Sequence, residues 1–600
     1  MMTNFKVLSI WGGLLTGAAL MMGPLGAAEP WPTNKERPNI VLVMTDDQGY
    51  GDFGCLGNDW IRTPEIDAMA ARSATWQEFY VSPVCSPTRA CLMTGRYNHR
   101  TKCIDTFLGR SMMATDEVTI AEVLSGAGYR TGIFGKWHLG DNYPMRPSDQ
   151  GFEYSLVHKG GGLGQPADPR DNKGRYTDAL LFENDREVPT VGYCTDVFFD
   201  RAFTFMRKSQ QQGKPFFAYV ALNAPHSPFH DVPTELYESY KNVDFASIIT
   251  EGKQKKDKKE NDKLARIASM ITNIDDNMGR LFKELDSMGV TENTIVIFLT
   301  DNGPNTRRYV AGFQGKKSEV YEGGVRTPIW IQWPAQLKAG TVVKESVAAH
   351  IDLMPTLLDA CGVEEIPANL DGRSVLQKLK QPDAALEKRP LVIQYHRGDE
   401  ISKYHSCLVR KGAWKLVHPS GTQKEKFTGE QPAWELYNLK SDPGERKNLF
   451  AAEPELAAEL IKEYEAWYAS VSVERADQPG PPYIVIDKEK ENPCVLTWQD
   501  MIEGTWRPTV VGYYKVDFAH SGRFDVRVEA AWGHKIDKSK KWTARLKIGD
   551  KEFTAPFDPE TKMGVFEALE LPAGKCKFEP SIRSESGETL SIYHARIMHR

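Results

Sequence analysis

Hydrophobic runs alternate with amphipathic stretches through the first two thirds of the chain. Four runs of mostly apolar, often β-branched residues predict strands that are covered on both faces, at 39–44, 129–134, 215–220 and 294–299. Between them, residues 66–73 and 264–288 show helical periodicity. Strands that alternate with helices predict an α/β fold with a mostly parallel sheet sandwiched by helices.

The pattern changes toward the C-terminus. Strand-like pieces at 390–395 and 413–417 precede an amphipathic helix at 454–468, which predicts a small α+β subdomain. After the linker-like stretch Gln478-Pro-Gly-Pro-Pro482, apolar and polar residues alternate with period two, as at 524–530. We therefore expect an α/β domain over 29–375, the subdomain over 376–477, and a separate β-sandwich-like module over 482–600.

The first 28 residues differ from the rest of the chain. Lys6 precedes an apolar run from Val7 to Met22, and small residues lead up to Ala28. This pattern predicts a signal peptide over 1–28 and an exported protein, periplasmic or secreted. The alternative is a membrane anchor, but ~16 apolar residues interrupted by glycines are short for a span. No later run is long enough to cross a bilayer, so we expect a mature chain without a membrane span.

Composition narrows the possible functions. Of the 600 residues, 41% are hydrophobic and 26% are charged, which is typical of a globular protein. The net charge is −5, which indicates neither a nucleic-acid-binding nor a membrane-binding surface. An anionic ligand would therefore need a local cationic site. The nine cysteines are an odd number, so disulfides would leave at least one cysteine unpaired.

Each predicted strand of the α/β domain is followed directly by polar residues. These are Asp46-Asp47, Lys136-Trp-His138, Asn223-Ala-Pro-His226 and Asp301-Asn302. Ligands of open parallel sheets bind where the carboxyl ends of the strands converge. The four clusters therefore predict one site assembled from distant parts of the sequence.

Two of these clusters supply only oxygen ligands. Asp46, Asp47, Asp301 and Asn302 suit a hard cation, a single Ca²⁺ or in second place Mg²⁺, better than zinc. An isolated Asp-Asp pair is as often a turn or a helix cap. The second acidic cluster after another strand favours the metal site.

Another motif lies between the first and second strands. Cys85-Ser-Pro-Thr-Arg89, followed by a stretch that ends in Thr94-Gly-Arg96, resembles the signature of the sulfatase family. The resemblance covers roughly residues 36–450, with the family's motifs in order. They include Gly135-Lys-Trp-His-Leu-Gly140, Ala224-Pro-His-Ser-Pro228, Thr300-Asp-Asn-Gly303, Lys317 and Tyr321-Glu-Gly-Gly-Val-Arg-Thr-Pro328. Without this motif, we would interpret Cys85 as a disulfide partner or a small buried residue.

The resemblance implies an alkaline-phosphatase-like fold and a sulfate ester substrate. It implies that a maturation enzyme oxidises Cys85 to Cα-formylglycine, whose hydrate attacks sulfur and also binds the metal. Lys136 and Lys317 would hold sulfate oxygens, and Arg89 would hold the hydrate. His226 would protonate the leaving alcohol, and His138 would take a proton from the second hydroxyl to regenerate the aldehyde.

Two other functions stay open on the sequence alone. A phosphomonoester or phosphonate hydrolase of the same fold would use similar chemistry. A non-catalytic glycan-binding protein would act through the module, with exposed aromatic residues such as Trp532 or Trp542, but the pattern fits core positions for these two residues equally well. Export and the added module favour a sulfated glycan as the substrate, by analogy. Loop residues that we expect to select the substrate are His158, Arg170, His230, Arg307 and His396.

Overall fold

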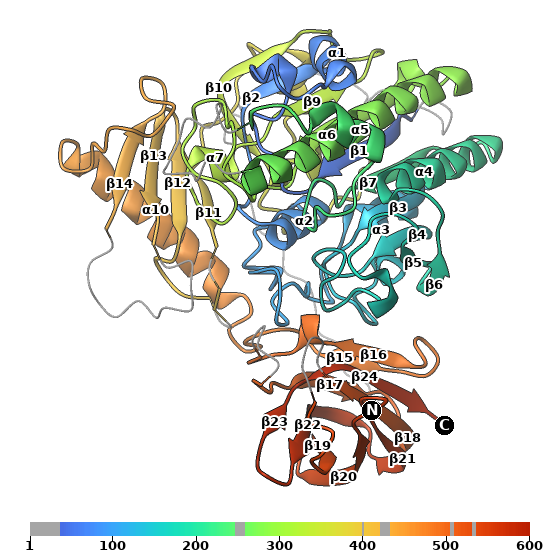
Figure 1. Cartoon of the computed structure of the whole chain (residues 1–600). Coiled ribbons are helices and arrows are strands. Elements are labelled where there is room, and N and C mark those ends of the chain that lie inside the picture. The colour runs from blue at the N-terminus through green and yellow to red at the C-terminus, as the bar shows by residue number, and fades with distance from the viewer. Residues whose placement is uncertain are drawn as a thin grey trace, which may run out of the picture.

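A ten-stranded sheet forms the centre of the α/β domain (Figure 1). The computed structural model describes residues 37–245, 258–395, 397–398, 401–420, 433–504, 509–530 and 536–600. The predicted signal peptide, His396 and Trp532 lie outside these residues. In sheet order, the strands are β10 (Val342–Ala349), β2 (Ala74–Tyr80), β9 (Ile329–Gln332), β8 (Thr294–Thr300), β1 (Asn39–Thr45), β7 (Phe216–Ala221), β3 (Arg130–Lys136), β4 (Tyr154–His158), β5 (Leu180–Glu183) and β6 (Arg186–Pro189).

The middle of this sheet is parallel. β1 pairs in parallel with β7 and β8, and β3 pairs in parallel with β7 and β4. Antiparallel pairs occur on both sides of this block, where β9 joins β8 to β2 and where β5 and β6 extend the sheet. The four strands predicted from the sequence are therefore neighbours, and their carboxyl ends lie at one edge.

Alternate residues of β1 face two separate cores. Ile40, Leu42 and Met44 pack in one hydrophobic cluster, and Val41 and Val43 pack in the other. Helices α2 (Cys85–Thr94), α3 (Ile120–Gly126), α8 (Leu353–Ala360) and α9 (Leu376–Lys380) contribute to the first cluster, and α1 (Pro64–Arg72), α4 (Cys194–Gln211) and α6 (Lys258–Met288) to the second. The apolar runs are continuous because both faces of the strand are buried. The predicted α/β fold, with its sheet sandwiched by helices, is confirmed.

The smaller α+β part lies to one side of this domain, at the left in Figure 1. Its antiparallel sheet has the order β11 (Leu391–Gln394), β12 (Cys407–Lys411), β13 (Trp414–His418) and β14 (Glu435–Asn438). Helix α10 (Pro454–Val473) packs on β12 and β13, and five of its residues are buried, including Leu460 and Tyr464. No helix within the described residues is long and apolar enough to cross a membrane.

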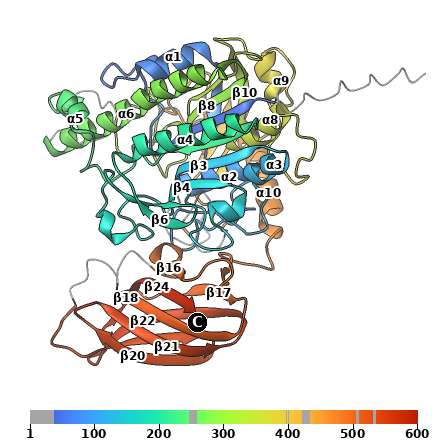
Figure 2. The same ribbon diagram turned by 90° about the vertical axis from the view of Figure 1, so that its right-hand side faces the viewer.

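The C-terminal module is a second ten-stranded sheet that folds over its own core. One part has the order β15 (Ile484–Ile486), β17 (Tyr514–Phe518), β22 (Gly574–Ser584), β19 (Trp542–Ile548) and β20 (Lys551–Asp558), and the short β23 (Thr589–Leu590) pairs with β22. The other part has the order β21 (Met563–Leu571), β18 (Gly522–Ala530), β24 (Ile592–His599) and β16 (Cys494–Thr497). Only two residue pairs join β20 to β21, so the module is sandwich-like, as the period-two pattern predicts. It lies directly beneath the α/β domain (Figures 1 and 2).

Candidate functional site

The predicted acidic residues meet at the carboxyl edge of the parallel strands. Asp46 and Asp47 follow β1, and Asp301 and Asn302 follow the neighbouring β8; all four are buried. The backbone N–H of Asp47 donates to Asp301 Oδ1 at 3.2 Å. Asn302 Nδ2 donates to Asp47 Oδ1 at 2.9 Å. The two clusters therefore form one group of side chains.

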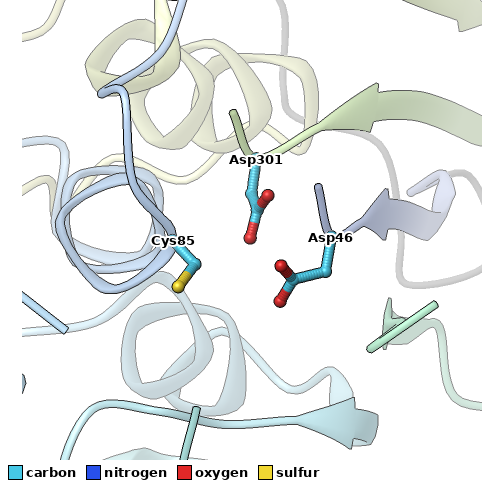
Figure 3. A group of neighbouring side chains, drawn as sticks. All are labelled: Asp46, Cys85 and Asp301. Carbon is cyan, nitrogen blue, oxygen red and sulfur yellow. The ribbon is translucent and has the colours of Figure 1, made fainter. Parts of the chain in front are cut away.

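This group fits a hard divalent cation. Within the described residues, Asp46 Oδ1, Asp47 Oδ2 and Asn302 Oδ1 are buried and accept no hydrogen bond. Buried acceptor oxygens without a partner are costly, and a bound cation would satisfy them together. One atom each of Asp46, Cys85 and Asp301 lies within 4.8 Å of the others, and Figure 3 shows these three side chains pointing into one shared space. The donor set is mostly oxygen, which suits Ca²⁺ or Mg²⁺.

Cationic side chains surround the acidic group. Arg89 Nη2 lies 3.2 Å from Asp46 Oδ2 and 2.9 Å from Asp301 Oδ2. Lys136 Nζ also bonds Asp46, and Lys317 Nζ lies 2.6 Å from Asp47 Oδ1. The site thus combines a place for a cation with two ammonium groups at its margin.

The surroundings move the pKa values of the two central carboxyls in opposite directions. Burial raises the pKa of Asp46, but the neighbouring cations, Lys136 first, outweigh it and hold the pKa well below its ordinary range. Burial also raises the pKa of Asp301, and the charge of Asp46 adds to the effect, so that it reaches about 7. Two carboxyls this close are costly to ionise together, which a divalent cation between them would relieve.

Cys85 begins helix α2 and faces the acidic group. Its side chain is 2% exposed, and Sγ lies 3.5 Å from His138 Nδ1. Burial raises the pKa of the Cys85 thiol, and the charges of Asp46 and Asp301 oppose the lowering by Lys136 and Lys317. A thiol with a raised pKa is a poor nucleophile near neutral pH.

The unprotonated ring nitrogen of His138, Nδ1, faces Cys85. Its Nε2 lies 2.7 Å from the Thr106 carbonyl oxygen, which can only accept a hydrogen bond, so Nε2 carries the proton in the neutral ring. Nδ1 is then the acceptor that faces residue 85. Burial lowers the pKa of His138 well below its ordinary value, and the charge of Lys136 lowers it further. His138 has φ +60°, and Asp47 has the same φ, so two site residues adopt strained left-handed backbone.

His226 borders the acidic group, where one ligand atom each of Asp46, Asp47 and His226 lies within 4.8 Å of the others. Its Nδ1 donates to the Ser227 carbonyl oxygen at 2.7 Å, which leaves Nε2 directed at Asp47 Oδ2, 3.6 Å away. Burial lowers the pKa of His226, and the Asp47 carboxylate opposes this. The site thus has one histidine nitrogen facing residue 85 and a second, independent one beside Asp47.

Comparison with known protein families identifies the chain. Residues 38–363 match the family model described as Sulfatase, which is more than half of the 600 residues. The chain belongs to the sulfatase family. It is therefore a sulfuric ester hydrolase. Residues 312–468 match a second model, N-sulphoglucosamine sulphohydrolase, C-terminal. Neither match extends into the C-terminal module.

Individual relatives agree with this assignment. Arylsulfatase A of Homo sapiens is 30% identical over 460 residues, which cover 71% of this chain and 86% of that protein. N-acetylglucosamine-6-O-sulfatase of Bacteroides thetaiotaomicron is 26% identical over 518 residues, which cover 73% and 86%. Among solved structures, Ps i-CgsB in complex with k-i-k-neocarrahexaose has a TM-score of 0.61 at 28% identity, and the match covers 72% of this sulfatase and 93% of that chain.

The loop residues predicted for substrate selection are scattered in this sulfatase. The prediction that His158 lies in a loop is wrong, because His158 is the last residue of strand β4, where it is buried and pairs in register with Lys136 of β3. Arg170 instead binds the module, where it pairs with Glu529 and donates to the Ala530 carbonyl oxygen at 2.7 Å. His230 is exposed, and Arg307 lines a cavity of about 420 Å³.

The structure answers two questions that the sequence left open, the exposure of Trp542 and the pairing of the cysteines. Trp542 is 3% exposed and packs in the module's core, so it is not a surface aromatic that could bind a glycan. Along β19, the buried residues Trp542, Ala544, Leu546 and Ile548 alternate with more exposed polar residues. All nine cysteines are free, so the possible disulfides are not formed in this structure.

The Tyr321–Pro328 motif packs against the loop that carries Asp301 and Asn302. Gly303 N donates to the Gly324 carbonyl oxygen at 3.0 Å, and a Cβ on Gly303 would lie 1.9 Å from the Gly323 carbonyl oxygen. Glu322, at the start of α7 (Glu322–Val325), binds Lys415 of β13 at 2.8 Å. The motif therefore joins the loop of Asp301 and Asn302 to the α+β subdomain.

The sequence did not predict the residues that contact the Nε2 side of the His138 ring. The Thr106 carbonyl oxygen accepts its Nε2–H, and Gln499 Nε2 lies 3.3 Å from that same nitrogen. Gln499 belongs to the C-terminal module, 361 positions away. No local pattern marks such a contact, because it exists only once the module is packed against the domain.

Proposed function

We propose that this sulfatase removes sulfate from a sulfated glycan, using a formylglycine derived from Cys85 and one bound Ca²⁺. The observation that carries the proposal is the position of Cys85, buried at the start of α2 between two carboxylates and a histidine nitrogen. The modification requires a maturase as a transient partner and fits an exported protein.

The proposed substrate class comes from the relatives. Among them are proteins named N-acetylglucosamine-6-O-sulfatase and N-acetylgalactosamine-6-sulfatase, and a structure that holds neocarrahexaose. All three names refer to carbohydrates. A sulfated saccharide is therefore the substrate class that we propose for this chain.

The proposed metal ligands are Asp46, Asp47, Asp301, Asn302 and the modified side chain at position 85. A bound divalent cation lowers the pKa of a coordinated hydroxyl and neutralises charge in the transition state, which is worth several kcal/mol. Arg89 contacts both Asp46 and Asp301. We assign it the role of fixing those carboxylates, in addition to holding the hydrate.

Lys136 and Lys317 bind the transferred group in this proposal. Lys136 contacts Asp46, and Lys317 contacts Asp47. A sulfate ester is anionic, so fixed cations aimed at its oxygens stabilise the transition state. The N-terminus of α2 adds partial positive charge at the same place.

The two histidines transfer protons in separate steps. His138 takes a proton from the side chain at position 85 through Nδ1, because its Nε2 is already protonated. His226 donates from Nε2 to the oxygen of the leaving alcohol, and its Nδ1–H stays on the Ser227 carbonyl. Asp47, 3.6 Å from Nε2, favours the charged ring that this donation needs.

Turnover of paired model substrates tests the proposal. The enzyme, produced together with a formylglycine-generating maturase, should hydrolyse an aryl sulfate far faster than the matching aryl phosphate, and Cys85→Ala should abolish the sulfatase activity. Release of sulfate from a panel of sulfated sugars then tests the substrate class. Faster turnover of the phosphate would favour the phosphomonoester or phosphonate hydrolase instead.

A further inference from the structure

The C-terminal module packs directly against the loops that carry the candidate site. Met112 and Met145 of the α/β domain are buried within the module's own hydrophobic core. Asn142 Nδ2 donates to the Val495 carbonyl oxygen at 3.0 Å, and Thr497 Oγ1 donates to Asp141 Oδ2 at 3.0 Å. The contact is thus apolar at its core and hydrogen-bonded at its edges, unlike that of a freely tethered domain.

Gln499 is a module residue that lies next to the candidate site, 3.3 Å from His138 Nε2. It lies just after β16, and its side chain is buried at 1% exposure. Its Nε2 donates to the Thr106 carbonyl oxygen at 2.7 Å and to Ser111 Oγ at 3.1 Å. Its backbone carbonyl oxygen accepts the Gly109 N–H at 3.0 Å. Gln499 therefore makes hydrogen bonds to three residues of the segment 106–111.

These bonds act on His138 through the Thr106 carbonyl oxygen. That oxygen accepts from both Gln499 Nε2 and His138 Nε2, which lie 3.3 Å apart. Because a carbonyl cannot donate, the amide must present its NH₂ group here, and His138 must keep its proton on Nε2. Gln499 thus fixes the Thr106 carbonyl oxygen, which keeps the proton of His138 on Nε2. Nδ1 of His138 is then unprotonated and faces residue 85.

A second contact from the module reaches the same side of the site. Tyr593 Oη donates to the Asp168 carbonyl oxygen at 3.1 Å, in the loop that contains Gln165. A Cβ on Gly161 would lie 2.4 Å from Gln165 Oε1 and 3.1 Å from the His138 ring. The loop next to His138 is therefore also held by the module.

We propose that Gln499 is a positioning residue for catalysis and that the C-terminal module is part of the working active site. The module fixes the Thr106 carbonyl, and through it the ring orientation and tautomer of His138. This inference rests on the proposed role of His138 as the base. It gives the module a function other than glycan binding.

Gln499→Leu tests the inference in the full-length, matured enzyme. Leucine keeps most of the side-chain volume but removes the amide, so we expect kcat for an aryl sulfate to fall by about 10- to 100-fold, the usual effect of losing a residue that orients a site ligand. KM should change less than about twofold, because Gln499 does not touch the substrate. The matched control is Thr497→Val, which removes a hydrogen bond from the same contact surface without approaching His138. Its kcat should stay within about twofold of the wild-type value.

A second measurement needs no turnover. In protein labelled with ¹⁵N-histidine, the ring nitrogens of His138, assigned by comparison with a His138→Asn sample, should report protonated Nε2 and bare Nδ1 in the wild type. In Gln499→Leu we expect a mixture of the two tautomers.

Two results would overturn the inference: an unchanged kcat in Gln499→Leu, or equal losses in Gln499→Leu and Thr497→Val, which would mean that the contact is only structural. If the wild-type enzyme hydrolyses no sulfate ester, the proposed function fails. The histidine spectra then still decide whether Gln499 fixes the ring: a tautomer that stays on Nε2 in Gln499→Leu contradicts that role, and a mixture supports it.

Discussion

Replacement of Lys415 by methionine tests the buried ion cluster formed by Lys415, Glu322 and Glu445, which lies next to the loop of the candidate metal site. Lys415 Nζ lies 2.8 Å from Glu322 Oε1 and 2.8 Å from Glu445 Oε1, and all three side chains have no exposed surface. Methionine keeps the length of the stem but leaves two carboxylates without their shared cation. Removing one partner of a buried ion pair costs about 3–5 kcal/mol of unfolding free energy. Glu322 keeps Arg326 at 3.0 Å, which places the expected loss at the lower end of that range.

The loss should also depend on pH. Burial raises the pKa of Glu445 to about 7 in the folded protein, above its ordinary value of 4.5, and Lys415 opposes this rise. A raised pKa means that the folded state holds a proton that the unfolded state releases, so this contribution to stability is present below pH 4.5 and is lost as pH rises through about 7. Without Lys415 the folded pKa rises further. Lys415→Met should therefore destabilise more at pH 8 than at pH 6.

Urea unfolding followed by tryptophan fluorescence at the two pH values measures both effects. Lys440→Met is the matched control, because Lys440 is 75% exposed and pairs with an exposed Glu345. An exposed pair contributes at most about 1 kcal/mol. If Lys415→Met loses no more than Lys440→Met, or loses more at pH 6 than at pH 8, the reasoning about the cluster is wrong.

Three further outcomes follow from the site. Lys317→Ala should lower kcat for an aryl sulfate by on the order of 10²–10³-fold, because it removes one fixed donor to the charge that develops in the transition state. An unchanged kcat would show that Lys317 does not stabilise the transition state. Removal of the cation by a chelator should abolish turnover and lower the midpoint of thermal unfolding. Ca²⁺ added back at ~100 times its Kd should restore about 2.7 kcal/mol of unfolding free energy. A midpoint that changes neither with the chelator nor with Ca²⁺ would contradict the proposed metal site. Gly303→Ala should weaken Ca²⁺ binding by about 10-fold or more, because its Cβ would lie 1.9 Å from the Gly323 carbonyl oxygen and displace the Asp301-Asn302 loop. Gly126→Ala, with nothing within 4 Å, is the control and should bind Ca²⁺ normally.

The sequence predicted the strands and the polar residues that follow them, because both depend on local pattern. A strand buried on both faces must be apolar throughout, and ligands of parallel sheets lie at strand ends, so Asp46 and Asp301 were expected to meet. The structure places β1 beside β8 and brings those residues together. The alternation in 524–530 likewise predicted which side chains of β18 are buried.

What the sequence did not predict depends on contacts between distant segments. Glu322 stood inside a recognised motif, but its partner Lys415 lies 93 positions away on another sheet. Gln499 reaches His138 only because the module docks on the α/β domain. The left-handed backbone of Asp47 and His138 likewise depends on the surrounding structure, since neither residue type requires it.

The central claim is that the side chain at position 85 is an aldehyde in the active enzyme. Peptide mass analysis of Cys85 after production with a maturase tests it most directly. We expect the peptide to lose ~18 Da, as conversion of a thiol side chain to a carbonyl requires, and sulfatase activity to rise in proportion to the converted fraction. An unmodified thiol at position 85 in fully active enzyme would contradict the account.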